Sequence, residues 1–147
     1  MSTGPSPATR QLVLERDGYR CVSCRSSIYG HGQGFSIHHR MPRGMGGTRN
    51  PEVNLPANLL LLCGSGTTGC HGWLESHREK AKEWGYLIRR GTASPAFEPV
   101  LTADGWRRFD NDGGIADAYP TNHTAEKQRE LDAHAERARL ERTGAAV

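Results

Sequence analysis

The four cysteines of this chain constrain its fold more than any other sequence feature. They form two pairs, Cys21 with Cys24 and Cys63 with Cys70. Thiolate sulfur is a good zinc ligand, and four thiolates close a tetrahedron that leaves no open position for water. The sequence therefore predicts a zinc site that stabilises the fold and does no chemistry. Residues 64–69, between the second pair, are rich in glycine, and we expect a flexible connection that bulges outward.

Two other interpretations of the cysteines stay open: two disulfides in an exported protein, or a buried Cys63 or Cys70 that binds nothing. The first residues are polar and lack the apolar segment of a secretory signal. No apolar run approaches the ~20 residues that a membrane helix needs. We therefore expect a cytoplasmic chain, in which thiols stay reduced and paired cysteines bind metal. With only 35% hydrophobic residues, the core is expected to be small and to need the zinc as a cross-link.

Several segments have clear secondary-structure signals. Residues 1–6 are expected to be disordered, and Ser6 and Pro7 suit the start of a helix. The expected elements are a helix over 7–16, a strand over 35–40, an irregular loop over 41–56, a buried strand over 59–62 and a helix over 71–85. Short strands follow over 86–90, 99–102 and 105–109, and then a helix over 125–142. That last helix is so polar that we expect it to be solvent-exposed or a docking surface for a partner.

The order of motifs carries a resemblance. The pattern is Cys-x-x-Cys, then His-His, Gly-Gly, Asn-Leu-Leu-Leu-Leu-Cys and Cys-His. It resembles the HNH endonucleases, and more narrowly the small HNH proteins of bacteriophages, over about residues 7–90. The resemblance implies an α+β fold with a ββα-metal (HNH, His-Me finger) core held by a four-cysteine zinc site. Residues 91–147 would be a C-terminal extension of short strands and a polar helix. The second cysteine pair, with six residues between its members, departs from the usual Cys-x-x-Cys.

Two adjacent histidines, His38 and His39, lie in the first expected strand. Successive strand residues point to opposite faces, so the two cannot do the same job. The resemblance implies that His38 is a ligand of a catalytic metal and that His39 is the general base. An ordinary imidazole pKa of ~6.5 suits proton abstraction near neutral pH. Without the cysteines and Asn58, two ordinary strand histidines would be the simpler interpretation.

The resemblance also assigns His71, at the start of the next helix, as a second ligand of the catalytic metal. Glu75 lies four residues later on the same helical face, where some family members have histidine. Its carboxylate suits Mg²⁺ or Mn²⁺, and we also consider Ni²⁺. His77 points away from His71 and is expected to be a surface or DNA-contacting residue, with metal binding as the alternative. Asn58 is expected to bind the backbone after His39 and so to orient the base.

Three arginines, Arg40, Arg43 and Arg49, flank the expected site as candidates for phosphate binding, with Arg43 first. The glycines within 44–47 could let a phosphate approach the backbone closely. Solvated arginines are the competing interpretation. The net charge of +3 is compatible with nucleic acid but does not decide the matter.

We therefore expect a metal-dependent DNA endonuclease that hydrolyses phosphodiester bonds with a histidine base and one divalent metal. The resemblance to phage proteins further implies a role beside the terminase in genome packaging, in the host cytoplasm. The alternative is a non-catalytic zinc-ribbon module that binds nucleic acid or acts as an adaptor. Such a module would need the cysteines and arginines but not His38, His39 or His71.

Overall fold

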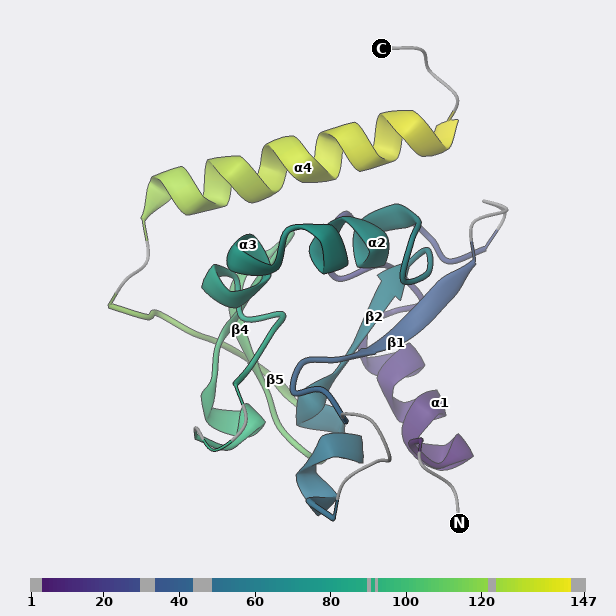
Figure 1. Ribbon diagram of the computed structural model, residues 1–147, viewed down its shortest axis with the longest axis vertical. Helices are drawn as coiled ribbons and strands as arrows, with labels where there is room; N and C mark the ends of the chain where they lie inside the picture. The colour runs from purple at the N-terminus through teal and green to yellow at the C-terminus, as the bar shows by residue number, and fades with distance from the viewer. Residues whose placement is uncertain are drawn as a thin grey trace.

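The computed structural model describes residues 4–29, 34–43, 49–89, 91, 93–121 and 124–143. The fold is mixed α/β, with two small antiparallel sheets between helices (Figure 1). Strands β1 (Phe35–His39) and β2 (Leu59–Cys63) form the first sheet, with Phe35 opposite Cys63 and His39 opposite Leu59. Both strands lie within a residue of their predicted ends. The histidine pair therefore ends β1 beside the first residues of β2.

The apolar side chains of β2 alternate between two hydrophobic cores. All five of its residues are buried. Leu59 and Leu61 pack with Val13 of helix α1 (Pro7–Arg16), whereas Leu60 and Leu62 join the larger cluster around the cysteines. A strand presents alternate side chains to opposite faces, which explains the division. This position between two apolar layers fixes the register of β1 and hence of its histidines.

Helix α1 has the predicted bounds and the predicted cap. The Ser6 hydroxyl accepts a hydrogen bond from the Thr9 N–H at 3.1 Å, and Pro7 occupies the first turn. At the other end, Arg16 donates to the Pro56 and Leu59 carbonyl oxygens at 2.8 and 2.6 Å. These bonds join α1 to the start of β2.

The expected helix over residues 71–85 is wrong as one element: the structure has α2 (Gly69–Ser76) and α3 (Arg78–Glu83), with a break at His77. The His77 backbone has φ −127° and ψ 61°, outside the helical region. Its Nδ1 lies 2.8 Å from the Trp73 carbonyl oxygen, the acceptor that its own N–H would use in a continuous helix. The imidazole also stacks on Trp73 with ring centroids 4.0 Å apart. A side chain thus replaces a helical hydrogen bond.

The second sheet has the order β3 (Val100–Thr102), β4 (Gly105–Phe109) and β5 (Ile115–Asp117). The sequence predicted β3 and β4 but missed β5, whose residues are all exposed and give no apolar alternation. The expected strand over 86–90 is wrong for 86–89, which form no strand. Within the loop expected to be irregular, the prolines start two short 3-10 helices, η1 (Pro51–Asn54) and η2 (Pro56–Asn58), and η3 (Pro95–Phe97) follows later.

Helix α4 (Ala125–Thr143) forms at the predicted place but is neither fully exposed nor unpartnered. It crosses the molecule beside α2 and α3 (Figure 1). Leu131, Ala135 and Ala138 are buried in the same cluster as the cysteines and β3. Small alanines allow a close approach without the large apolar stripe that marks a packed helix. Residues before and after position 90 therefore share one core. No helix in the described part of the chain is long and apolar enough to cross a membrane.

Candidate functional site

The four cysteines come together in one buried cluster. Their sulfur atoms all lie within 4.8 Å of one another, and the Sγ atoms of Cys24 and Cys63 are 3.9 Å apart. A tetrahedral zinc with Zn–S bonds of ~2.3 Å places its sulfurs about 3.8 Å apart. All four are free thiols, so the described cysteines form no disulfide. The cluster therefore fits a metal such as zinc, as the sequence predicted.

Each cysteine pair sits on a turn that fixes its sulfurs. At the first pair, the Cys21 N–H donates to the Ser26 carbonyl at 2.9 Å, and the Arg25 N–H donates to the Cys21 carbonyl at 2.8 Å. Arg25 adopts a left-handed conformation with φ 69°. The turn brings both thiols of the pair to the same side of the chain, because Cys24 lies inside the loop that these two hydrogen bonds close.

The connection within the second pair is a tight hydrogen-bonded turn, whereas the sequence suggested a flexible bulge. Ser65 and Thr68 pair across it, with N···O distances of 3.1 and 3.3 Å. Gly64 and Gly69 flank the turn with φ values of 86° and 63°. A Cβ on Gly64 would overlap the Thr68 carbonyl, so only glycine fits there. The turn holds the two sulfurs in place despite their wider spacing in the sequence.

Helix α4 reaches the cysteine cluster, a contact that the sequence did not predict. His134 is 3% exposed, and its Nε2 lies 3.3 Å from the Cys70 sulfur. Arg139 donates to the Cys24 carbonyl oxygen at 3.0 Å. A ring N–H can donate to a thiolate and so stabilise it as a metal ligand. Nothing in the sequence around His134 marks it, because its partner lies on an element 64 residues away.

The thiols cannot all ionise in this position without a cation. Burial raises the pKa of Cys21 well above its ordinary value, and hydrogen bonding with Cys21 raises the pKa of Cys70. Hydrogen bonding with Cys21 lowers the pKa of Cys63 to about 7. A bound divalent ion would offset part of the negative charge and allow every sulfur to act as a thiolate.

A second group of potential metal ligands contains His38, His71 and Glu75, whose ligand atoms lie within 4.8 Å of one another. His38 comes from β1, and the other two come from α2. The His38 and His71 rings meet edge to face, with centroids 5.1 Å apart. Two nitrogens and a carboxylate oxygen suit Mn²⁺, Ni²⁺ or Zn²⁺ and, through the carboxylate, Mg²⁺.

The neighbours of these histidines leave nitrogens available for a metal. The His38 Nε2 lies 2.6 Å from the Tyr86 carbonyl, which can only accept, so Nε2 carries the proton and Nδ1 keeps its lone pair. Burial lowers the pKa of His38 to about 4, which keeps the ring neutral. The buried Nδ1 of His71 has no hydrogen-bond partner in the described part of the chain, which is unusual unless a metal ion or ordered solvent completes it.

His39 faces a different partner. Its Nε2 lies 2.8 Å from the Oδ1 of Asn54, in η1, which holds the ring by accepting from the Nε2–H. This leaves the Nδ1 lone pair to accept a proton. Burial lowers the pKa of His39 from its ordinary value, although the Asn54 bond opposes this effect. The sequence did not single out Asn54, because no local pattern connects it to residue 39.

Asn58 holds the backbone after the histidine pair, as predicted. Its Oδ1 accepts from the Met41 N–H at 2.8 Å, and its Nδ2 donates to the Met41 and Val53 carbonyls at 3.1 and 2.8 Å. The bond to Val53 also fixes η1, which carries Asn54. Asn58 therefore acts on His39 through the backbone and not by direct contact.

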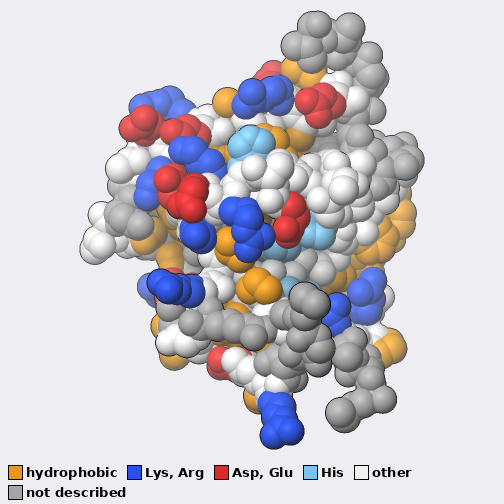
Figure 2. All heavy atoms as spheres, viewed as in Figure 1, with side chains coloured by type: hydrophobic (Ala, Val, Ile, Leu, Met, Phe, Trp, Pro, Cys, Tyr) orange, Lys and Arg blue, Asp and Glu red, His pale blue; other side chains and the backbone are white. Residues whose placement is uncertain are grey.

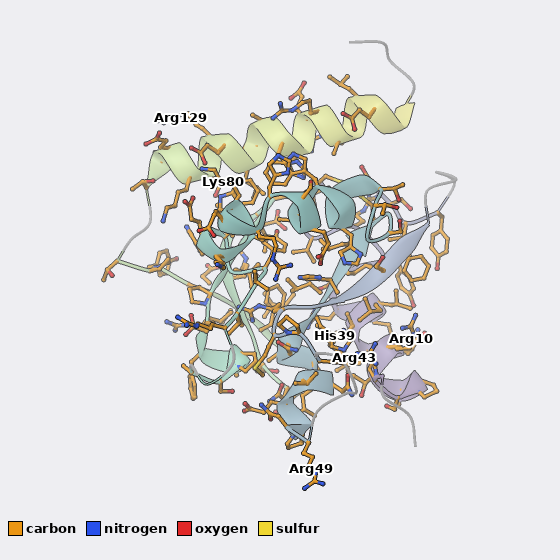
Figure 3. The ribbon with its side chains drawn as sticks, in the orientation of Figure 1. Arg10, His39, Arg43, Arg49, Lys80 and Arg129 are labelled. Atoms are coloured by element: carbon orange, nitrogen blue, oxygen red, sulfur yellow. The ribbon has the colours of Figure 1, made fainter. Side chains whose placement is uncertain are left out.

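The candidate metal ligands and the candidate base His39 line the same cleft, which has a volume of about 600 Å³. His38, His39, His71 and Glu75 line it. Three arginines line it too: Arg10 of α1, Arg43 of the segment after β1, and Arg78 of α3. Arg10 and Arg43 lie near His39 in Figure 3. Arg43 was the favoured phosphate contact from the sequence, whereas Arg10 and Arg78 were not singled out. The cleft thus combines candidate base, metal ligands and cations.

The prediction that Arg40 binds nucleic acid is wrong. Its side chain is fully buried and donates to four backbone carbonyls, those of Gly85, Ala57, Pro95 and Glu98, at 2.8–3.0 Å. Burial lowers its pKa to about 9, still high enough for a charged guanidinium at neutral pH. The carbonyl acceptors lie 17–58 residues from Arg40 in the sequence, so no local pattern marked its burial.

The remaining predicted contacts lie outside the cleft. Arg49 is exposed and sits apart from His39 and Arg43 (Figure 3). His77 is exposed, as predicted, and stacks on Trp73. The glycines within 44–47 lie outside the described residues. Neither Arg49 nor His77 is among the residues that line the cleft.

We found no protein-family model, curated protein or solved structure that matches this chain. The resemblance to HNH proteins thus stays a prediction, and the function proposed below rests on the geometry of the cleft.

Proposed function

We propose that this protein is a metal-dependent DNA endonuclease in which His39 is the general base. One observation carries the proposal: a base held by Asn54 and a three-ligand metal group share a cleft with three arginines. In this proposal β1, β2 and α2 are a ββα-metal unit, the arrangement that the HNH resemblance implies.

His39 would take a proton from water. The Asn54 Oδ1 accepts from Nε2–H, so the Nδ1 lone pair is the free basic position. Its lowered pKa keeps the ring unprotonated at neutral pH, which is the form that a base needs. Asn58 keeps the backbone of the following residue in place, so the ring stays oriented during the reaction.

His38, His71 and Glu75 would hold a divalent metal, and the chain fits one because their ligand atoms converge and the His38 tautomer is set. Such a metal supplies charge neutralisation at the phosphate and stabilises the leaving oxygen. Arg10, Arg43 and Arg78 would bind phosphate oxygens on either side of it. The cysteine cluster is a separate structural site.

The resemblance to phage proteins extends the proposal to a role beside the terminase in genome packaging. That extension rests on the sequence motifs alone. A zinc-ribbon adaptor is the competing function. An adaptor would need neither a general base nor a second group of metal ligands, so it does not account for the residues that line the cleft.

The test is plasmid cleavage with Mg²⁺, Mn²⁺, Ni²⁺ or Zn²⁺ added singly. Wild type should nick or linearise DNA, and His39→Ala should lose activity about 10²–10⁴-fold, the usual contribution of a general base. Arg129→Ala is the control, since this arginine is exposed on α4 and lies far from His39 in Figure 3. Circular dichroism and zinc content should be unchanged in both variants. Equal cleavage by wild type and His39→Ala would rule out the proposed base.

A further inference from the structure

A second hollow adjoins the candidate cleft. It measures about 680 Å³, and we call it the side groove; its lining residues are Pro42, Arg78, Lys82, Leu87, Ile88 and Arg89. Pro42, Arg78 and Leu87 line the cleft as well. The two hollows therefore adjoin, and a chain-like ligand that crosses these shared residues could run from the base along α3.

The charged residues that line the side groove are all basic: Arg78, Lys82 and Arg89. Figure 2 shows Lys and Arg side chains on both sides of the lower histidines on this face, while the acidic side chains gather mostly above them. Glu75 and Glu79 contact Arg78 and Lys82 at 3.4 and 3.2 Å. Such exposed ion pairs contribute little, so a phosphate can replace the carboxylates.

The floor of the side groove is apolar. Pro42, Leu87 and Ile88 form it, and Ile88 is only 6% exposed. A duplex presents its phosphates outward and keeps its base faces stacked inside, so an apolar floor adds nothing to a duplex contact. A single strand exposes sugars and base faces along with its phosphates, and sites for it combine a basic groove with side chains against which bases pack, most often aromatic ones. In the side groove, Pro42, Leu87 and Ile88 would offer an aliphatic surface in that position.

We propose that the side groove binds a single-stranded stretch of DNA that leads to the scissile phosphate. This inference rests on the proposed nuclease function of the cleft and adds the form of its substrate. The preferred DNA would have an unpaired segment beside the cut, as in a flap, a gap or a frayed end. Lys82 and Arg89 would bind phosphates of that segment, and Leu87 would contact its sugars or bases.

The test measures binding without cleavage, in the His39→Ala background, by fluorescence anisotropy with a single-stranded oligonucleotide and with its duplex. The groove variant carries Lys82→Ala together with Arg89→Ala. It is compared with a control variant that carries Lys127→Ala together with Arg129→Ala. The control pair removes the same two charges from α4, and Arg129 lies far from His39 in Figure 3. A salt series is recorded for each protein.

We expect tighter binding to the single strand than to the duplex. The groove variant should bind the single strand about tenfold more weakly, and its salt slope should fall by about 1.4, since each phosphate contact on a single strand contributes about 0.7. The control variant should match the parent. Equal losses in both variants, or tighter binding to the duplex, would overturn the proposal.

The results separate this inference from the nuclease proposal. If wild type never cuts DNA but the groove variant loses single-strand binding, the catalytic proposal fails and the side groove stands. If wild type cuts DNA through His39 but the groove variant binds the single strand like its parent, the side groove fails and the nuclease stands.

Discussion

His39 and Arg40 are adjacent in the chain, yet they face opposite environments. His39 is half-buried at the cleft, whereas Arg40 is enclosed by backbone carbonyls. Carbonyl acceptors from distant segments enclose Arg40, so a local cluster of His and Arg residues does not by itself form a site. The environment of each residue decides its role, and two predictions follow at this scale.

The first concerns the pH dependence of cleavage. Burial lowers the pKa of His39, so the base becomes protonated, and activity is lost, only below the ordinary histidine value of ~6.5. The acid limb of kcat/KM against pH should therefore have its midpoint below ~6.5, measured at saturating metal. An acid limb with its midpoint above ~7 would contradict the role of a neutral, buried base.

The second concerns Arg40. Removing this guanidinium leaves four carbonyls unpaired in the core, so Arg40→Ala should lower the free energy of unfolding by at least ~3 kcal/mol. Arg49→Ala is the control, because this exposed arginine should change stability by less than ~0.5 kcal/mol. Urea denaturation measures both. A stable, cleavage-deficient Arg40→Ala protein would instead support the rejected phosphate contact.

At the scale of elements, α4 is coupled to the cysteine cluster through His134 and Arg139. Loss of a partner of a metal ligand typically weakens metal affinity 10–100-fold. We expect His134→Ala to release zinc to a chelator correspondingly faster than wild type, with a chromogenic zinc indicator as the readout. Asp132→Ala, an exposed change on the same helix, should release zinc at the wild-type rate. Equal rates for all three proteins would show that α4 does not support the metal.

Elements with a strong local signal were predictable. Ser6 with Pro7 marks the start of α1, and the run of leucines marks β2. The break at His77 was not predictable, because it depends on one side chain that captures the Trp73 carbonyl. The burial of α4 was hidden as well, since Leu131 is the one large apolar residue among the alanines and the histidine that are buried on its inner face. These contacts come from tertiary packing, which overrides local propensity.

The candidate site also has parts that the sequence predicted and parts that depend on tertiary contacts. The cysteine pairs pointed to one shared metal, and the family resemblance pointed to a second metal at His38 and His71, with Glu75 as a further candidate ligand; the structure brings both groups together. The sequence could not identify Asn54, whose contact with His39 requires η1 to be in place. Nor could it identify Arg10, which reaches the cleft from α1. Sequence motifs identify residues that act together in a site. Hydrogen-bond partners and lining residues from distant elements can be identified only from the folded structure.

At the scale of the whole molecule, the cysteine cluster lies within the larger hydrophobic core and joins the segments that pack there. Its neighbours include Leu60, Trp84, Leu101 and Leu131, which come from segments that extend from β2 to α4. We expect Cys63→Ser, or full removal of zinc, to unfold the protein, since metal binding and folding are coupled at such sites. Far-UV circular dichroism should show the loss of helix and its recovery when zinc is returned to the wild type. A folded, monodisperse protein without zinc would refute this structural role.

The central claim is that two metal sites have separate jobs, the cysteines for folding and the cleft for hydrolysis. The most direct test removes weakly bound metal with brief chelation, then measures zinc content and DNA cleavage on the same samples before and after Mn²⁺ is added. We predict that the zinc at the cysteines remains throughout, that cleavage disappears and returns with Mn²⁺, and that His71→Ala keeps its zinc but does not recover. Cleavage that follows zinc content alone, with no need for a second metal, would contradict the claim.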